Sequence, residues 1–369
     1  MTDNMLSTLH KVGLFLSNRL DAKLLVEDTN SWIECMQSFP HNKLVPVSYK
    51  PTSINYQREY FSAVYDNYCD ISMVLYRGGT AVAILPMCIY EHEGIVNIGC
   101  NGLTMQEPLF ARLPKSEAQR KIIRNILESI AIVPECFDIK MSDSLVTTIP
   151  ITDEGSSQWQ RVWMESGARA VKVSWYLYAD LFLDSNEISH RTRRTNKYSI
   201  EQAHNDFDIE IYDSVNGINE AFEEFHDLHR RVSGRETRSQ ATWDIQRNNV
   251  TANCDRAGYD FVVFLKDKSN GALAGAALFE CTPQSAYYSV AAYDRSRFSK
   301  PIGHVVQAVA MDYMKTKGIR WYVVGERPYP GECHTIKEVN IGKYKEGFAT
   351  HFFPHITMEL NIRNISNFV

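Results

Sequence analysis

The sequence is poor in the features that mark several large classes of protein. None of its 8 cysteines stands in a C-x-x-C pair, so the spacing typical of structural zinc sites and of thioredoxin-like redox motifs is missing. It has no run of about 18 apolar residues, and no basic segment followed by an apolar signal core opens the chain. The sequence therefore predicts a soluble, cytoplasmic protein with reduced thiols, no metal and no membrane association.

An excess of positive charge is missing as well. The chain has 39 Lys+Arg against 44 Asp+Glu, a formal net charge of -5. Because proteins that bind nucleic acid need a basic face to neutralise phosphates, a nucleic-acid partner is not expected. The motifs G-x-S-x-G and H-E-x-x-H are also absent, and the glycines of residues 99–102 lack the spacing of a nucleotide fingerprint.

What the chain does contain is a pattern that occurs twice. Its 369 residues, 44% of them hydrophobic, suffice for two domains that each build a core. Each half has helices, a meander of three antiparallel strands, a crossover helix and a further strand. We therefore predict an α+β fold made of two tandem modules, residues 1–185 and 186–369, each a mixed, mostly antiparallel sheet flanked by helices.

The expected elements follow from hydrophobic periodicity and from Gly and Pro. In the first module we expect helices at 4–20, 115–133 (stopped by Pro134) and 155–167, a helical stretch ending near 70, and strands at 44–49, 71–76, 81–90, 95–99, 136–141 and 171–183. In the second we expect helices at 188–204, 216–232, 240–254 and 302–317, and strands at 208–212, 261–266, 273–280, 286–294 and 320–325. Gly78-Gly79 and Asn270-Gly271 are expected at equivalent hairpin turns.

This order resembles that of the GNAT (Gcn5-related N-acetyltransferase) fold. In that layout strands 286–294 and 320–325 are parallel neighbours that must splay, and the crossover helix presents free N–H groups beside the gap. A pyrophosphate docks well on such donors and on the positive end of the helix dipole. We therefore expect an acyl-CoA in the wedge, with the backbone of Val290, Ala291 and Ala292 supplying N–H donors to the oxyanion.

Only the second module has a basic entry to its crossover helix. Residues 295–304 carry three cations, two hydroxyls and a glycine, whereas residues 101–108 of the first module include Glu107 and no cation. We therefore expect the donor in the second module, and the first module as a structural and acceptor-side wall. The residues expected to bind the donor here are Arg297, Ser299, Lys300, Ile302 and Gly303. The alternative is an ordinary solvated loop.

Two further basic clusters suggest a phosphorylated or nucleotide-bearing acceptor. Their alternative is a helix surface whose cations pair with Glu201, Glu223 and Glu224. The residues expected to bind the acceptor are Arg191, Arg193, Arg194, Lys197, Arg231, Arg235, Arg238 and the neighbouring Trp243.

Four segments carry a family resemblance. Residues 190–203, 228–243, 286–303 and 335–348 resemble the FemAB-like, tandem-GNAT acyltransferases of bacterial surface-polysaccharide gene clusters, whereas the first half is similar in topology only. The resemblance implies transfer of an acetyl or short 3-hydroxyacyl group, such as 3-hydroxybutyryl, from CoA to the amino group of a dTDP-linked amino-deoxy sugar, for O-antigen or capsule biosynthesis. In these relatives an aromatic-Lys pair lies at the reacting carbonyl, which implies that role for Tyr344 and Lys345.

Acyl transfer to an amine needs a base within reach of the amine and a donor for the oxyanion. We expect the base to be Glu280, Asp294 or His304, each of which has a structural alternative as a polar strand end, a loop cap or a packed histidine. Two functional alternatives stay open: an aminoacyl-tRNA-dependent transferase of FemAB type, and a non-catalytic pair of modules that binds a nucleotide sugar. The oligomeric state is left open.

Overall fold

The computed structural model describes residues 2–112, 115–152, 155–184, 200–201, 204–214, 219–251, 258–294, 302–330 and 334–365. The chain divides into two compact units, each built from separate stretches of sequence. Unit 1 comprises Met1–Phe39, Ser53–Ser174 and Pro354–Val369, and unit 2 comprises Pro40–Thr52 and Trp175–Phe353. The expected module boundary at 185 adjoins residues 185–199, which lie outside the described residues, and it stays a prediction.

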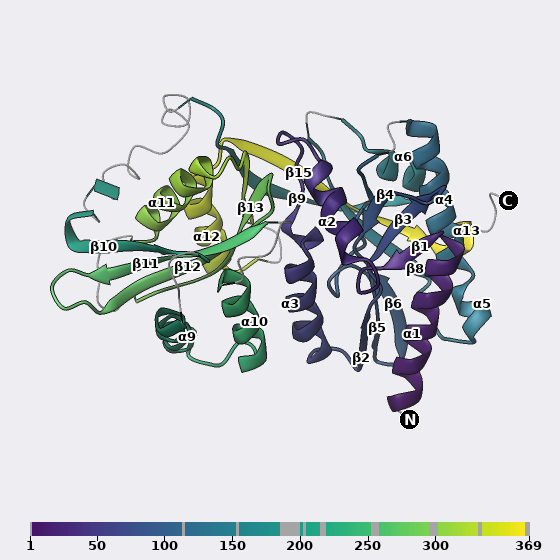
Figure 1. The fold of residues 1–369 in the computed structure, drawn as a ribbon, viewed down its shortest axis with the longest axis horizontal. Helices are drawn as coiled ribbons and strands as arrows, with labels where there is room; N and C mark the ends of the chain where they lie inside the picture. The colour runs from purple at the N-terminus through teal and green to yellow at the C-terminus, as the bar shows by residue number, and fades with distance from the viewer. Residues whose placement is uncertain are drawn as a thin grey trace. The chain divides into compact units, whose positions relative to one another are not determined.

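Unit 1 combines helices with short sheets (Figure 1). Its helices are α1 (Thr2–Arg19), α2 (Thr29–Ser38), α3 (Pro51–Ser62), α4 (Ser116–Ala131), α5 (Val133–Phe137), α6 (Gln158–Glu165) and α13 (Ile362–Ile365). Its strands are β1 (Ala22–Leu24), β2 (Asn67–Asp70), β3 (Met73–Arg77), β4 (Thr80–Leu85), β5 (Cys88–His92), β6 (Ile95–Gly99), β7 (Leu109–Phe110) and β8 (Ser144–Pro150). They form the orders β1-β3-β4-β7 and β2-β5-β6, and β8 pairs with β15 (His351–Asn361).

Prolines account for three corrections to the expected elements. The strand expected at 81–90 is two strands, β4 and β5, in different sheets, because Pro86 has no N–H for a continuous ladder. Pro134 does not end helix structure but starts α5, so no strand forms at 136–141. The segment expected as a strand at 44–49 has only a 3-10 turn, η1 (Val47–Tyr49), after Pro46. The meander of three antiparallel strands predicted for the first half is thus not formed, because its residues give β3 and β4 in one sheet and β5 and β6 in another.

Unit 2 is one twisted sheet with helices on both faces. The remaining elements are β9 (Arg169–Asp180), β10 (Phe207–Tyr212), α9 (Asn219–Ser233), α10 (Gln240–Thr251), β11 (Tyr259–Asp267), β12 (Leu273–Cys281), β13 (Ser285–Tyr293), α11 (Gly303–Thr316), β14 (Trp321–Glu326) and α12 (Ile336–Glu346). Within unit 2 the strands lie in the order β10-β11-β12-β13-β14-β9-β15. The predicted second-half meander and crossover helix are confirmed. The helix expected at 188–204 lies almost wholly outside the described residues.

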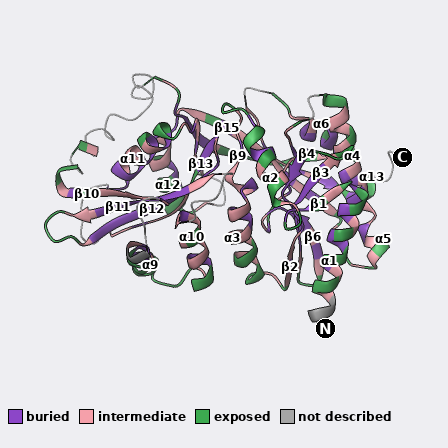
Figure 2. Cartoon of the chain, viewed as in Figure 1, coloured by how far each residue is buried: buried purple, intermediate pink, exposed green. Residues whose placement is uncertain are grey.

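The two faces of this sheet are distinguished by the helices that cover them (Figure 1). On the α11 face, apolar residues of α11 such as Val305 and Val306 pack against Phe261 and Phe279. On the opposite α9 face, Phe225 of α9 and Trp243 of α10 form a second cluster. Because neighbouring residues of a strand point to opposite faces, β11 and β12 are buried along most of their length (Figure 2).

The expected glycine turns are present. Gly78 and Gly79 connect β3 to β4 with φ of 58° and 77°, and Gly271 has φ 71° between β11 and β12. Among the described residues, no helix combines the length and the apolar character needed to cross a membrane. Within the same residues, no group of three or more His, Cys, Asp or Glu side chains is arranged to hold a metal ion.

Candidate functional site

The sheet of unit 2 opens between β13 and β14. The two strands are parallel and pair only through Ser285–Trp321, Ala286–Tyr322 and Tyr287–Val323. Beyond these pairs β13 continues to Tyr293 and β14 to Glu326 without further pairing. We call this opening, bordered by residues 288–293 and 324–326, the fork. The predicted divergence of these two strands is thus present.

The backbone of β13 presents N–H groups to the fork in alternation. The N–H of Asp294, the residue after β13, donates to the Ala274 carbonyl of β12 at 2.9 Å, and the register runs unbroken from there to the pair Val290–Leu278. Since antiparallel hydrogen bonds alternate, the N–H groups of Val290 and Ala292 point to β12 and that of Ala291 points to the open edge. Of the three predicted backbone donors, Ala291 is the one directed into the fork.

Lys345 and Tyr344 of α12 border the fork on the α11 face. The Lys345 Nζ lies 5.7 Å from the ring centroid of Tyr288 on β13, and a Cβ built on Gly325 of β14 would lie 2.6 Å from it. The ammonium therefore bridges the two diverging strands. Burial lowers the pKa of Lys345, and the carboxylate of Glu326 opposes this shift.

The start of α11 packs directly against Tyr344. A Cβ on Gly303 would lie only 2.8 Å from the Tyr344 hydroxyl, so the glycine permits the close approach of the ring. His304, one residue on, meets the same ring edge-on, with centroids 4.9 Å apart. Ile302 is buried in the core of the α11 face. This places Gly303 and His304 beside the fork, and makes Ile302 a packing residue in the structure.

Glu280 lies at the fork on the other, α9 face. It is 8% exposed and pairs across the sheet with Tyr287 of β13 and Asp260 of β11. The register shifts between Leu278 and Phe279, which leaves Ser289 as an extra residue in β13. The Ser289 hydroxyl donates to Glu280 Oε1 at 2.6 Å. The bulge thus positions a hydroxyl that orients the candidate base.

A second carboxylate faces the fork from β14. Glu326 pairs across the sheet with Tyr176 of β9, so both side chains lie on the α9 face. The pKa of Tyr287 is raised by desolvation and by the charges of Glu280 and Glu326. The fork is therefore lined by a cation on its α11 face and by two carboxylates on its α9 face.

Asp294 directly follows the last residue of β13. The second basic cluster lies at and beyond the end of α9. Arg238 stacks on Trp243, its Cζ 3.6 Å from the ring centroid, and Trp243 is only 1% exposed. The expectation that Trp243 touches the acceptor is therefore corrected, because it is a core residue that supports Arg238. Arg231 and Arg235 are exposed at the end of α9.

The remaining predicted residues lie outside the described residues. These are Arg191, Arg193, Arg194 and Lys197 of the first basic cluster, and Arg297, Ser299 and Lys300 before α11. Their assignments stay predictions. Sequence reasoning missed Lys50, Asp260, Ser289 and Glu326. A bulge and a cross-strand carboxylate pair leave no periodic signal, although Glu326 does stand in the turn-rich stretch 325–331 that follows the last predicted strand.

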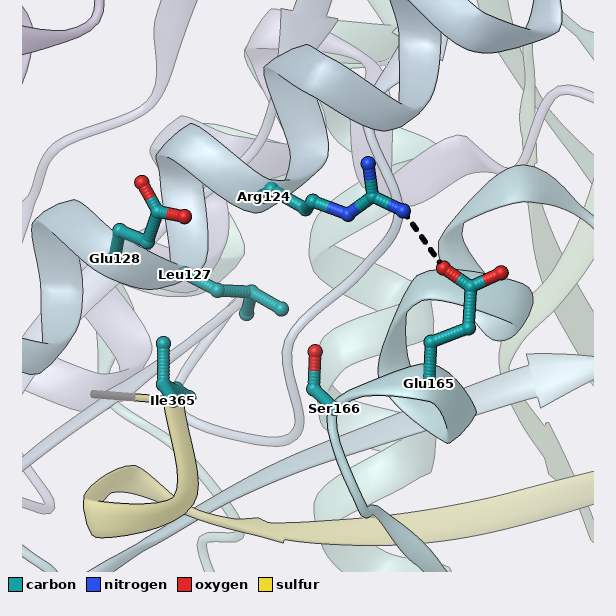
Figure 3. Close-up of a pocket in the computed structure, with 6 residues that line it drawn as sticks. All are labelled: Arg124, Leu127, Glu128, Glu165, Ser166 and Ile365. Atoms are coloured by element: carbon teal, nitrogen blue, oxygen red, sulfur yellow. Dashed lines mark hydrogen bonds and ion pairs between the residues drawn. The ribbon is translucent and has the colours of Figure 1, made fainter. Parts of the chain in front are cut away.

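A pocket of a different kind is present in unit 1, between α4, α6 and α13 (Figure 3). Leu127 and Ile365 give it apolar walls, and Arg124 forms an ion pair with Glu165 at 2.8 Å across it. None of the predicted site residues lines this pocket. Glu128 and Ser166 complete its lining.

No family model and no curated protein matches the sequence. Solved structures match over most of the chain. FemX is 10% identical, with 88% of this chain and 96% of FemX covered and a TM-score of 0.63. A C-terminal DUF2156 domain described as that of a lysylphosphatidylglycerol synthetase from Agrobacterium fabrum is 11% identical over 93% of this chain and 94% of its own, with a TM-score of 0.54.

L-PGS from Bacillus licheniformis is likewise 11% identical, over 80% of this chain and 88% of its own, with a TM-score of 0.53. At such identities the likeness concerns the fold. The predicted α+β fold class is confirmed, and these comparisons show that the chain shares the fold of FemX.

Proposed function

We propose that this protein transfers an acyl group from an activated carrier at the fork to the amino group of an acceptor. The observation that carries the proposal is the distribution of charge around the opening between β13 and β14. Lys345 lies on the α11 face, Glu280 on the α9 face, and the N–H of Ala291 points into the gap between them. Carrier and acceptor thus approach from opposite faces of one sheet.

These positions suit the steps of acyl transfer. The acceptor nitrogen attacks the carbonyl carbon while Glu280 takes its proton, and the Ala291 N–H donates to the oxyanion. The bond between carbonyl carbon and carrier sulfur then breaks, and the sulfur leaves with the electron pair. Lys345 can supply the proton to that sulfur, because its lowered pKa makes its ammonium a stronger acid than an exposed lysine.

The carrier in this proposal is an acyl-CoA, and the acceptor is a nucleotide-linked amino sugar of the dTDP-amino-deoxyhexose type. The close packing of Tyr344 on Gly303 leaves the first turn of α11 beside the fork, where its N–H groups suit a pyrophosphate. The exposed Arg231 lies in the last turn of α9 and Arg235 follows that helix, which covers the acceptor face of this proposal. Their charges suit the diphosphate of a sugar nucleotide.

The direct test is the release of CoA thiol from acetyl-CoA and 3-hydroxybutyryl-CoA in the presence of dTDP-linked amino sugars. We expect release only with the amino sugar and not with its hydroxyl analogue. Glu280→Gln should reduce the rate about 100-fold or more. Lys266→Met, which breaks a half-exposed ion pair in the same sheet, serves as the control. Binding of the nucleotide sugar without turnover with any carrier would favour a non-catalytic module.

A second candidate is an aminoacyl transferase that uses aminoacyl-tRNA. The likeness of fold to FemX and to the domain of a lysylphosphatidylglycerol synthetase supports it, since the latter name denotes transfer of a lysyl group. The acyl carbon chemistry at the fork is the same, but the leaving group is a ribose oxygen. Transfer of a labelled aminoacyl group from tRNA would support this candidate, and the affinity of the protein for tRNA should then fall steeply with salt. Release of CoA from acyl-CoA would support the first candidate.

A further inference from the structure

The side-chain amide of Gln307 is buried without a partner for its nitrogen. Gln307 lies in α11 and is 0% exposed. Its Oε1 accepts a hydrogen bond from the Tyr322 hydroxyl of β14, whereas its Nε2 has no hydrogen-bond partner among the described residues. A buried N–H group without an acceptor costs free energy that an apolar side chain of similar shape would avoid. Such a group in a folded protein therefore needs an explanation beyond packing.

Tyrosine side chains on the α11 face of the sheet connect this amide to the fork. The rings of Tyr322 and Tyr288 both pack against Phe279, with centroids 6.1 Å and 5.6 Å from its centroid. Tyr288 belongs to the border of the fork, and its hydroxyl lies 3.2 Å from that of Tyr293 at the end of β13. The Gln307 amide, the Tyr322 hydroxyl and the two hydroxyls of β13 therefore lie on one face of the fork.

The start of α11 adds a fourth tyrosine to this group. A Cβ on Gly303 would lie 3.4 Å from Cε2 of Tyr293 and 2.8 Å from the Tyr344 hydroxyl, so both rings border the same glycine. Gly303 is the first residue of the helix that carries Gln307. We call these four side chains the tyrosine cluster: Tyr288, Tyr293, Tyr322 and Tyr344.

Two hydroxyls of the tyrosine cluster stay protonated at physiological pH. Burial, and then the hydroxyls of neighbouring tyrosines, raises the pKa of Tyr293 and of Tyr322, so both act as neutral hydrogen-bond donors and acceptors. The Lys345 ammonium borders the cluster, 5.7 Å from the ring centroid of Tyr288. Because it would repel a second ammonium, the cluster suits a neutral oxygen better than the amino group of an aminoacyl chain.

We propose that Gln307, together with the tyrosine cluster, selects an acyl group that carries a second oxygen beyond its reacting carbonyl. The inference rests on the proposed function, in which the carrier binds on the α11 face and its carbonyl oxygen meets the Ala291 N–H. The Gln307 Nε2 donates to the second oxygen, and a tyrosine hydroxyl of the cluster forms a further hydrogen bond to it. An acyl chain without that oxygen leaves the buried amide without a partner, so its carrier binds less tightly.

The test compares three acyl-CoA esters of equal chain length, bound to the full chain without an acceptor. By calorimetry, 3-hydroxybutyryl-CoA and acetoacetyl-CoA should bind about tenfold more tightly than butyryl-CoA. Gln307→Met removes the amide, so its affinities for the three esters should be equal. Gln160→Met makes the same substitution at a buried glutamine of α6 in unit 1, and it should keep the preference of the wild type.

Equal affinities in the wild type, or a preference that survives in Gln307→Met, would overturn the inference, because a glutamine that only fills the core cannot distinguish these esters. If Gln307→Met does not fold because the Tyr322 hydroxyl loses its acceptor, Gln307→Met/Tyr322→Phe replaces both partners by apolar groups, and the preference must be lost in that variant. Preferential binding without transfer to any amine would support the inference and refute the proposed function. Transfer without preference would do the reverse, and failure to bind any of the three esters would overturn both.

Discussion

Lys345 links stability to chemistry at a single side chain. Burial lowers its pKa relative to the unfolded chain, so the folded protein holds this proton less tightly. Between the folded and the unfolded pKa the unfolded chain binds more protons, and the contribution of Lys345 to stability therefore rises with pH through that window. At neutral pH its charge is a cost to folding, which the role proposed for it at the fork would explain.

We expect Lys345→Met to make the protein more stable and less active. The free energy of unfolding at pH 7 should rise by about 0.5–2 kcal/mol, and the rate of acyl transfer should fall about 100-fold or more. Denaturant unfolding and the thiol-release assay measure the two effects. Lys343→Met, at an exposed position of the same helix, should change neither, and an active Lys345→Met protein would remove Lys345 from the mechanism.

His355 gives unit 1 a dependence on pH. Burial lowers its pKa from 6.5 to about 4, so the unfolded chain binds a proton that the folded chain does not between those values. The contribution of neutral His355 to the free energy of unfolding is complete above pH 6.5 and is lost as the pH falls towards 4. We expect His355→Gln to show a smaller drop in Tm between pH 7 and pH 4.5 than the wild type. His10→Gln, at an exposed position, should behave like the wild type.

At the scale of elements, the start of α11 requires a residue without a side chain. Alanine in a helix is normally favoured over glycine by about 0.5–1 kcal/mol. At position 303, however, a Cβ would lie 2.8 Å from the Tyr344 hydroxyl, so we expect Gly303→Ala to displace that ring. Carrier affinity, measured by calorimetry with CoA, should fall about tenfold. Gly303→Ala/Tyr344→Phe should recover part of the loss, and equal affinities in all three would refute the contact.

The elements that the sequence predicts well are those whose burial is periodic. The apolar stripe of Val305, Val306 and Ala310 in α11, and the strands β11 to β13, lie within a few residues of the prediction. The site was predictable in part: Glu280, Lys345 and Gly303 border the fork. Lys50 was not, because its partner Asp260 is 210 positions away and only the tertiary fold brings them together.

At the scale of the whole molecule, the two units do not correspond to two halves of the chain. Unit 1 takes Pro354–Val369 from the C-terminal half, and unit 2 takes Pro40–Thr52 from the N-terminal half. Hydrophobic periodicity does not reveal this arrangement, because it indicates which residues form a strand but not which distant strand they pair with.

A split chain tests this arrangement. Residues 1–184 would lack β15, which pairs with β8 through residues 355–361. Residues 185–369 would lack Lys50 and leave the buried Asp260 without its ammonium. We expect neither fragment alone to unfold cooperatively in denaturant, whereas the two expressed together should regain the transition of the intact chain. A stable, cooperative fragment 185–369 would show that the segment Pro40–Thr52 is dispensable.

In the proposed function the carrier and the acceptor meet at the fork from opposite faces of one sheet, and this has a consequence for the order of events. A donor seated against α11 would leave the α9 face to the second substrate, which could then bind while the first is still in place. No side chain would then have to hold the acyl group covalently between the binding of the two substrates. Transfer would take place within a ternary complex of protein, donor and acceptor.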